Sequence, residues 1–449
     1  MTEVDPEPRT DTRPELRPDH RLLRGQAERF GVHIVDDQLK MEGVDLAAVA
    51  AAVDTPAFVY SSAAVTRRYE GLRAALSGRR TKICYAVKAN SNQTILRLLA
   101  RAGAGADIVS GGELERALAA GFDPGSIVFS GVGKRDREID AAIAARIRAI
   151  HVESVEEVRR VAARARAQGA VAPIALRLNP DIDPETHPYL ATGLQETKFG
   201  IAMADALEVA ALVANSPSLR LCGITCHIGS QIHDATPFLA GLARLRGIVD
   251  ELRVRRFDLE YLDLGGGLGV AYGLSDPSVD APSFGEALTA ATADLDLELV
   301  LEPGRYLVGN AGVLLTRVLT RKQSGDKRFV IVDAAMNDLI RPALYQAYHA
   351  IVPVRLPAAD APTVRADIVG PICECGDFFA RDRPIVWPAA GELLAILSAG
   401  AYGSTMASTY NTRPVAPEIV VRGDTFALTR PRRSVAAMIA DESYPPWLA

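Results

Sequence analysis

Eight short apolar runs rich in β-branched residues alternate with alanine-rich stretches of helical period from about residue 55 to residue 302. Strands that alternate with helices along a chain are typical of a parallel α/β architecture. Eight such strands close into the (β/α)8 barrel, also called the TIM barrel. The expected strands are residues 81–87, 106–110, 126–130, 149–153, 174–179, 223–228, 261–264 and 297–302.

The polar residues at the ends of these runs favour the barrel over an open sheet. Helices are expected at residues 93–101, 113–120, 135–146, 155–167, 204–214 and 237–254, lengths that suit right-handed crossovers. Barrel enzymes place their catalytic residues at the carboxyl ends of the strands. The runs here end in Lys88, Ser110, Asn179, His227, Gly265 to Gly267 and Glu302. An open doubly wound sheet would place its glycine-rich loop after the first strand, whereas this triplet follows the seventh.

The chain predicts a second domain after the barrel. Its 449 residues exceed the size at which one core normally stops growing. Beyond Arg305 the alternation stops, and residues 328–333, 364–369, 393–398 and the hairpin-like 418–429 around Gly423-Asp424 are expected strands. The run 32–41, with Asp36-Asp37 as its turn, is expected to be a hairpin that joins them. The predicted domains are a disordered tail at 1–25, a barrel at 55–306, and a mostly β domain formed by 26–54 and 307–449.

Composition makes nucleic acid and membrane surfaces poor candidates for partners. The chain is 48% hydrophobic and 23% charged with a net charge of −5, so it has no strong field of one sign. The first two dozen residues are rich in Pro, Asp, Glu and Arg and lack the apolar core of a signal peptide. No run reaches transmembrane length. A small-molecule ligand bound at a local site is expected.

The five cysteines indicate a reducing compartment, the cytoplasm. An odd number spread over a long chain is unlike a disulfide scaffold. Cys222 to Cys226 and Cys373 to Cys375 lack the two-residue gap and the partner pair that zinc sites usually show, so no metal is expected.

Lys88 stands where the first run turns polar, in the sequence Cys-Tyr-Ala-Val-Lys-Ala-Asn-Ser at 84–91. If 81–88 is a strand, Cys84, Ala86 and Lys88 share one face. Burial in a narrow apolar pocket would lower the pKa of the lysine, and its neutral amine could then form a Schiff base with a carbonyl compound. Judged by spacing alone, a strand-end lysine that reaches solvent is the simpler interpretation.

Two further motifs support a chemical role for Lys88. The glycines of Tyr-Leu-Asp-Leu-Gly-Gly-Gly-Leu-Gly at 261–269 follow strand seven, where barrels often bind phosphate; a tight turn without a ligand is the alternative. Glu302, followed by Pro-Gly-Arg305, places a carboxylate and an arginine at the barrel mouth; alone it would suggest a structural ion pair. Together with Lys88, this carboxylate can keep a pyridine nitrogen protonated so that the ring withdraws electrons.

Three other residues are candidates with simpler alternatives. His227 opens His-Ile-Gly-Ser-Gln at 227–231 and can stack on a planar cofactor or be a satisfied structural histidine. Cys373, in Cys-Glu-Cys-Gly-Asp at 373–377, can protonate a carbanion or be a buried, inert thiol. Tyr402 belongs to a polar, glycine-containing loop region, 401–414, and the sequence does not indicate what this loop binds.

Together these motifs resemble the fold type III pyridoxal-phosphate decarboxylases, most closely the diaminopimelate decarboxylases, from about residue 30 to the end. Residues 85–90, Tyr-Ala-Val-Lys-Ala-Asn, resemble the cofactor-lysine motif; 227–231 resemble the ring-stacking segment and 302–305 the segment for the pyridine nitrogen and phosphate. Residues 179–193 and 198–201 are similar to a stretch of the diaminopimelate branch. The resemblance implies an alanine racemase-like barrel with a mostly β second domain.

The resemblance also implies roles for individual residues. Pyridoxal 5′-phosphate would be held by Lys88, His227, Ser230, Gly265, Gly266, Gly267, Glu302, Gly304, Arg305 and Tyr402. Arg305, Arg341 and Tyr345 would bind the distal carboxylate of the substrate, Glu374 its distal ammonium, and Tyr402 would contact both substrate and cofactor. The catalytic set would be Lys88, His227 and Cys373, the last supplying a proton across the interface of a homodimer.

The implied reaction is decarboxylation of meso-2,6-diaminopimelate to L-lysine and carbon dioxide. Cys375 stands where the family commonly has a small hydroxyl residue, and the acidic tail is long, so a related basic or dicarboxylic amino acid stays open as substrate. A racemase on the same barrel would favour an arginine in place of Glu302. A cofactor-binding homologue without turnover would tend to lack the second domain, the lysine or the thiol, all of which are present.

Overall fold

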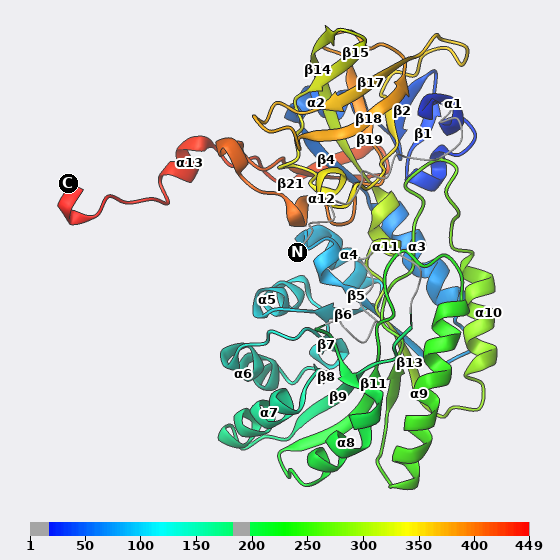
Figure 1. Ribbon diagram of the computed structural model, residues 1–449, viewed down its shortest axis with the longest axis vertical. Coiled ribbons are helices and arrows are strands. Elements are labelled where there is room, and N and C mark those ends of the chain that lie inside the picture. Colours follow the sequence, from blue (N-terminus) through cyan, green and yellow to red (C-terminus); the bar gives the residue numbers. More distant parts are fainter. Residues whose placement is uncertain (1–17, 183–197, 449) are drawn as a thin grey trace, which may run out of the picture.

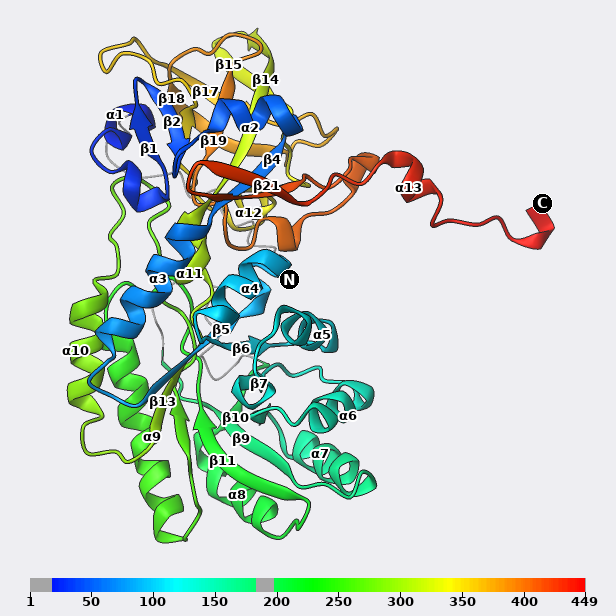
Figure 2. The same cartoon turned by 180° about the vertical axis from the view of Figure 1, so that it is seen from behind.

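The computed structural model describes residues 18–182 and 198–448. It has two parts, a barrel ringed by helices and a β-rich domain stacked on one end of it (Figure 1). The view from behind shows the same two parts and the C-terminal segment with helix α13 (Val435–Ile439) projecting away from them (Figure 2).

Eight parallel strands form the predicted barrel. In chain order they are β5 (Thr81–Ala86), β6 (Gly105–Ile108), β7 (Ile127–Phe129), β8 (Ala149–Val152), β9 (Ala172–Asn179), β11 (Leu219–Thr225), β12 (Tyr261–Asp263) and β13 (Glu298–Leu301). Each pairs with the next, and β13 pairs with β5, which closes the barrel. The two-residue strand β10 (Ile201–Ala202) pairs with β9 outside this ring. The predicted fold class is therefore confirmed.

The helices around the barrel begin where strand ends supply capping side chains. The Asn92 side chain accepts a hydrogen bond at the start of α4, Ser110 does so for α5 and Ser154 for α7, which satisfies backbone N–H groups that lack helical partners. Ser110, expected among the functional strand ends, is thus a helix cap. The helices are α3 (Ser62–Ala75), α4 (Gln93–Arg101), α5 (Gly111–Ala120), α6 (Asp136–Ala145), α7 (Val155–Ala167), α8 (Ala206–Ala214), α9 (Thr236–Val254), α10 (Ala281–Ala291) and α11 (Arg305–Val308).

A tyrosine fills the inside of the barrel. Tyr261 is fully buried among small side chains such as Cys84, Ala149 and Ala175. Its ring requires a glycine on the neighbouring strand, because a Cβ at Gly223 would lie 2.6 Å from the ring. The packed ring makes this part of the barrel a solid core rather than a pore, and the site lies above it at the carboxyl ends of the strands.

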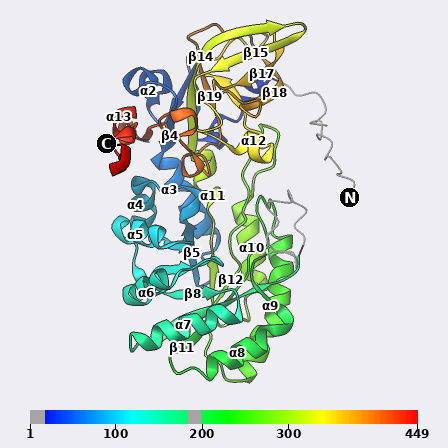
Figure 3. The same cartoon turned by 60° about the vertical axis from the view of Figure 1, so that its left-hand side comes forward.

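The second domain is built on one nine-stranded sheet with the path β18-β17-β15-β14-β4-β20-β21, and β19 pairs with both β14 and β16. Its strands are β4 (Ala57–Ser61), β14 (Gly312–Ser324), β15 (Lys327–Val332), β16 (Ile351–Pro353), β17 (Val364–Val369), β18 (Phe378–Ile385), β19 (Leu393–Ile396), β20 (Glu418–Arg422) and β21 (Thr425–Arg430). The short helix α12 (Arg341–Tyr345) lies at the edge of this domain that faces the barrel (Figure 3). The predicted hairpin around Gly423-Asp424 is present as β20 and β21.

The N-terminal segment packs on the second domain. The predicted hairpin is present as β1 (His33–Val35) and β2 (Gln38–Met41), followed by β3 (Val44–Asp45) and α2 (Leu46–Val53). Residues 1–17 of the predicted tail lie outside the described residues, whereas 19–23 form helix α1 (Asp19–Leu23). Asp19 is buried there and pairs with Arg383 at 2.9 Å, which ties α1 to β18.

The domain limits stay a prediction, and the position of β4 bears on them. Residues 57–61 hydrogen-bond to β14 and β20 of the second sheet, although the predicted limit of 55 assigns them to the barrel. A barrel limit near residue 62, at the start of α3, fits this pairing better. Among the described helices, none has the length and apolar character needed to cross a membrane.

Candidate active site

Lys88 lies directly above the first barrel strand, but not on it. Strand β5 ends at Ala86, and Lys88 belongs to a 3-10 turn, Val87–Ala89, so it does not continue the face of Cys84 and Ala86 as expected. Its Nζ lies 3.1 Å from Oδ2 of Asp107 on β6, and its side chain is 42% exposed. Burial alone would lower the pKa of Lys88, but the charge and hydrogen bond of Asp107 together with the charges of Tyr402 and Glu302 outweigh burial and raise it. The expected low pKa of the free lysine is therefore wrong.

Three buried carboxylates surround the barrel mouth near Lys88: Asp107, Asp263 at the end of β12, and Glu302 after β13. Burial raises the pKa of Glu302, and the charges of Asp107 and Asp263 raise it further. Burial likewise raises the pKa of Asp263. Oε1 of Glu302 and Oδ1 of Asp107 are buried and have no hydrogen-bond partner among the described residues. Such atoms are suited to a donor from a bound ligand.

His151 links these acids to the barrel core. The side-chain ligand atoms of His151, Asp263 and Glu302 lie within 4.8 Å of one another. Nδ1 of His151 is 3.2 Å from Oγ of Ser130, and Nε2 is 3.0 Å from the hydroxyl of Tyr261. Burial lowers the pKa of His151 well below its usual value, so its ring is neutral.

His227 and the glycine triplet pack tightly against each other. The N–H of Gly266 donates to Nδ1 of His227 at 3.2 Å, which fixes the imidazole ring. A Cβ at Gly265, Gly266 or Gly267 would lie 2.3–2.5 Å from backbone oxygens of Cys226, Glu302 or Gly229, and Gly265 and Gly267 have positive φ. The triplet therefore lets three loops of the barrel mouth approach closely. Burial lowers the pKa of His227 well below its usual value.

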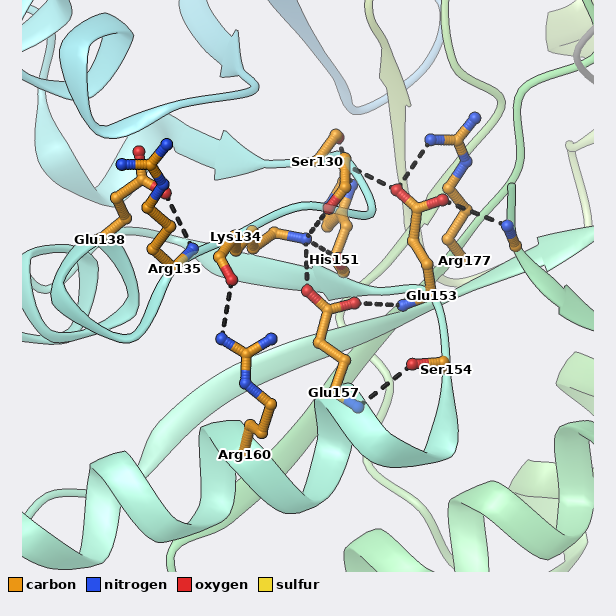
Figure 4. Close-up of polar contacts among 12 residues, drawn as sticks. Ser130, Lys134, Arg135, Glu138, His151, Glu153, Ser154, Glu157, Arg160 and Arg177 are labelled. Atoms are coloured by element: carbon orange, nitrogen blue, oxygen red, sulfur yellow. Dashed lines mark hydrogen bonds and ion pairs between the residues drawn. The ribbon is translucent and has the colours of Figure 1, made fainter. Parts of the chain in front are cut away.

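A buried polar network holds the other side of the mouth, at the ends of β7, β8 and β9 (Figure 4). Nζ of Lys134 donates to the carbonyl oxygens of Gly131 and His151 and to Oε1 of Glu157, at 2.6, 2.7 and 2.8 Å. Glu157 accepts from the N–H of Glu153 through its other oxygen, at 2.8 Å.

Glu153 connects this network to Arg177. Its Oε1 accepts from Nη1 of Arg177 at 3.0 Å and from the N–H of Gly131 at 2.8 Å. The charge of Arg177 in turn contributes to the low pKa of His227. The network therefore fixes a cation beside the candidate ring-stacking histidine.

Two arginines and two tyrosines form a cluster between the barrel and the second domain. Arg305 donates to the hydroxyl of Tyr272, and its guanidinium carbon lies 5.0 Å from the centre of the Tyr402 ring. Arg341 of α12 lies 4.3 Å from the Tyr272 ring centre and donates to Nε2 of His349 at 2.9 Å. Both arginines are buried, and neither forms an ion pair with a carboxylate of the described residues.

The cluster is joined to Lys88 through the backbone. The N–H of Tyr402 donates to the carbonyl of Ala89 at 2.8 Å, and Tyr402 has a φ of 55°. Tyr345 is close enough to Arg305 and Arg341 to act on the pKa of both. Gly304 packs beside the Lys88 turn, because a Cβ there would lie 3.0 Å from that of Ala89.

Cys373 and Glu374 are not brought to this mouth. Both lie exposed in the loop between β17 and β18, as does Cys375. The N–H of Cys373 bonds to Oδ1 of Asn411 at 3.3 Å, and Glu374 bonds to Tyr410. Ser230 lies half-buried in the loop after β11. The motif at 179–193 lies outside the described residues from 183 onward.

Comparison with known families shows which family the chain belongs to. Residues 62–309 match the family described as pyridoxal-dependent decarboxylase, pyridoxal binding domain. The chain belongs to this family. It is 49% identical to a diaminopimelate decarboxylase of Pseudomonas aeruginosa over 411 residues, which cover 92% of this chain and 98% of that protein. The family is one of carboxy-lyases whose cofactor is pyridoxal 5′-phosphate.

Solved structures of the family share the fold. The diaminopimelate decarboxylase of Helicobacter pylori, complexed with L-lysine, has a TM-score of 0.84 and 39% identity, over 88% of this chain and 98% of that one. The M. jannaschii diaminopimelate decarboxylase, in co-complex with L-lysine, has a TM-score of 0.88 and 34% identity, over 93% and 99%. The resemblance inferred from the motifs is confirmed.

The residues present fit the cofactor of the family. Oε1 of Glu302, which has no hydrogen-bond partner among the described residues and lies 3.6 Å from Nδ1 of the neutral His151, offers an acceptor to a protonated pyridine nitrogen. Lys88 lies close enough for its charge to act on the pKa of Glu302. The glycine triplet lies beside the ring of His227, and the N–H groups of Gly265 and Gly266 already donate to Asp263 and His227, so a phosphate site at the triplet stays a prediction.

Sequence reasoning missed five residues of this site: Asp107, His151, Asp263, Tyr272 and His349. A usable signal existed for two of them. Asp107 and Asp263 are carboxylates inside otherwise apolar strand runs that end at the barrel mouth. Asp and Glu are almost never fully buried unless they are paired, so an acid in such a run is worth examining.

Proposed function

We propose that the protein decarboxylates meso-2,6-diaminopimelate to L-lysine and carbon dioxide, with pyridoxal 5′-phosphate as cofactor. The observation that carries the substrate assignment is the pair of buried guanidiniums, Arg305 and Arg341, without an ion pair to any carboxylate of the described residues. Burying two cations near each other is costly unless an anion joins them. The second carboxylate of a dicarboxylic amino acid is such an anion. The names of the relatives support the same substrate.

The residues near Lys88 have distinct proposed tasks. When bound, the cofactor withdraws the electrons that the departing carboxylate leaves on the α-carbon. Lys88 would hold the cofactor covalently in the absence of substrate. Glu302 would accept a hydrogen bond from a protonated pyridine nitrogen, and His227, fixed by Gly266, would contact the ring.

The other end of the substrate is proposed to lie in the arginine cluster. Arg305, Arg341 and Tyr345 would bind the distal carboxylate, and Tyr402 would contact both substrate and cofactor because its backbone is bonded to the residue after Lys88. A substrate without the second carboxylate would leave two buried cations unpaired, so it should be strongly disfavoured.

The loss of carbon dioxide must be balanced by a proton on the α-carbon. We propose that Cys373 supplies it and Glu374 binds the distal ammonium, both from the partner of a homodimer. Both residues are exposed, and the partners that the structure shows for them are Asn411 and Tyr410 rather than Lys88, which supports this assignment. The five free thiols are in keeping with the cytoplasm as the compartment.

A complementation experiment tests the shared site. Lys88→Ala and Cys373→Ala chains, coexpressed with different tags, should recover about one quarter of wild-type activity, because half of the dimers are mixed and each mixed dimer has one intact site. Either variant alone should have far less. If Cys373 acted within its own chain, no mixed dimer would have an intact site, and an absence of recovery would overturn the proposal.

The substrate assignment is tested by following carbon dioxide release from the purified protein with its cofactor. Diaminopimelate should be consumed, whereas lysine, ornithine and arginine should react at least about 10³-fold less efficiently, since they lack the second carboxylate. Preference for one of these three would establish a related substrate instead. No release from any of the four would favour the cofactor-binding homologue without turnover.

A further inference from the structure

His349 makes two hydrogen bonds that together fix its protonation. Its Nδ1 lies 2.8 Å from the carbonyl oxygen of Leu397, and its Nε2 lies 2.9 Å from Nη1 of Arg341. A carbonyl oxygen can only accept and a guanidinium can only donate. Nδ1 must therefore carry the hydrogen and Nε2 must present its lone pair, so the ring is neutral.

The surroundings of His349 keep it in this form. The ring is fully buried, and the charged groups that act on it are the cations Arg341, Arg305 and Arg383. Burial, reinforced by these charges, lowers its pKa well below the usual value. The Tyr272 ring packs edge-on against it with centroids 5.0 Å apart.

The backbone of His349 is also held. Its carbonyl oxygen accepts from Nη1 of Arg383 at 3.0 Å, and Arg383 is paired with the buried Asp19 of α1. His349 is therefore held at both ring nitrogens and at its backbone carbonyl.

The position of Arg341 depends on this acceptor. Its guanidinium has Tyr272 on one face and His349 at Nη1 and has no carboxylate partner among the described residues. A guanidinium recognises a carboxylate through two parallel N–H donors, and this requires the planar group to be held in one orientation. The bond to Nε2 uses one donor and leaves the others for an anion.

We propose that His349, as the neutral Nδ1–H tautomer, is a positioning residue that orients Arg341 for the distal carboxylate and so sets the preference for dicarboxylic substrates. The inference rests on the proposed function. His349 does not touch the reacting atoms. Its effect is on the binding of one end of the substrate, not on the chemical step at the other.

Two substitutions separate the two ring nitrogens. In His349→Asn, the amide nitrogen replaces Nδ1 and keeps the bond to Leu397, but nothing accepts from Arg341. In His349→Gln, the longer side chain places an oxygen near the position of Nε2 and keeps the acceptor for Arg341. If His349 had only a structural role, both variants should have the same KM for diaminopimelate. The proposed role predicts that only the Asn variant has a raised KM.

The expected result for His349→Asn is a KM for diaminopimelate raised by about 10- to 100-fold with kcat little changed, because a misplaced binding group weakens ground-state and transition-state binding alike. His349→Gln should restore most of the wild-type KM. In His349→Asn, inhibition by L-lysine, which retains one carboxylate, should weaken as the KM for diaminopimelate rises. Inhibition by 1,5-diaminopentane, which has none, should not change.

Several outcomes would overturn the proposal. Equal KM values in the Asn and Gln variants, or parallel losses for L-lysine and 1,5-diaminopentane, would assign His349 to structure alone. If His349→Asn does not fold, Arg341→Lys provides the test, since it keeps His349 but removes the planar fork; a wild-type KM there contradicts the proposal. A wild-type enzyme that prefers a substrate with one carboxylate would refute the proposed function itself. That result is distinct from equal KM values in the two His349 variants, which would refute only the role of His349.

Discussion

A Lys88→Ala variant is expected to lose at least about 10³-fold in kcat and to retain no cofactor after borohydride reduction, because the covalent anchor is gone. The measurement besides activity is the mass of the reduced protein, which should carry the cofactor in the wild type and not in the variant. Asp107 keeps the free lysine charged. Lys88 would therefore have to give up a proton to bind the cofactor covalently.

Lys82→Ala is the matched control for this experiment. Lys82 lies near the start of the same strand, β5, at the opposite end of the barrel, where Nζ donates to the carbonyl of Gly103 at 3.2 Å. Its loss should leave activity and cofactor attachment unchanged. Trapped cofactor in the Lys88 variant, or wild-type turnover, would mean that another group anchors the cofactor.

The barrel was predictable because its two signals are local. Apolar runs of strand length and alanine-rich stretches of helical period are both set by nearby sequence. The position of β4 was not predictable in the same way. Its five residues read as one more apolar run, and only the tertiary pairing with β14 and β20 reveals which sheet they join.

In the candidate site, too, local motifs predict some features and only tertiary contacts reveal the others. Lys88, His227 and Glu302 each follow a strand and belong to short motifs, so their place at the mouth could be read from the sequence. The pKa of Lys88 could not, because it depends on Asp107, a residue of another strand 19 positions away. The pocket that Lys88 was expected to occupy is more acidic than the run 84–91 suggests.

Tyr272 and His349 illustrate a second kind of omission. Tyr272 contacts Arg305 within the barrel and Arg341 across the two domains, whereas His349 bonds to Arg341 within the second domain. Neither residue lies at a strand end of the barrel. Nothing in their local sequence marks them. Only the structure shows that both arginines have neutral partners, which is the observation on which the substrate assignment depends.

A Glu302→Gln variant is expected to lower kcat by about 10²- to 10³-fold, the cost of removing one preorganised charge from a buried catalytic site. Glutamine has nearly the same shape but cannot carry the negative charge that keeps a pyridine nitrogen protonated. The fit of the site to that nitrogen rests on the buried Oε1 of Glu302, which has no hydrogen-bond partner in the described part of the chain. The KM for diaminopimelate should change little, because the distal carboxylate lies elsewhere.

A second measurement separates this electronic role from a structural one. The cofactor should dissociate more readily from the Gln variant than from the wild type, while the melting temperature of the cofactor-free protein should not fall. Removing one of three crowded carboxylates relieves their repulsion, since Asp107 and Asp263 both raise the pKa of Glu302. Glu298→Gln, at the other end of β13 and paired with Arg148 at 2.5 Å, is the control and should keep wild-type kcat. A Glu302→Gln enzyme with wild-type kcat would show that electron withdrawal does not depend on this carboxylate.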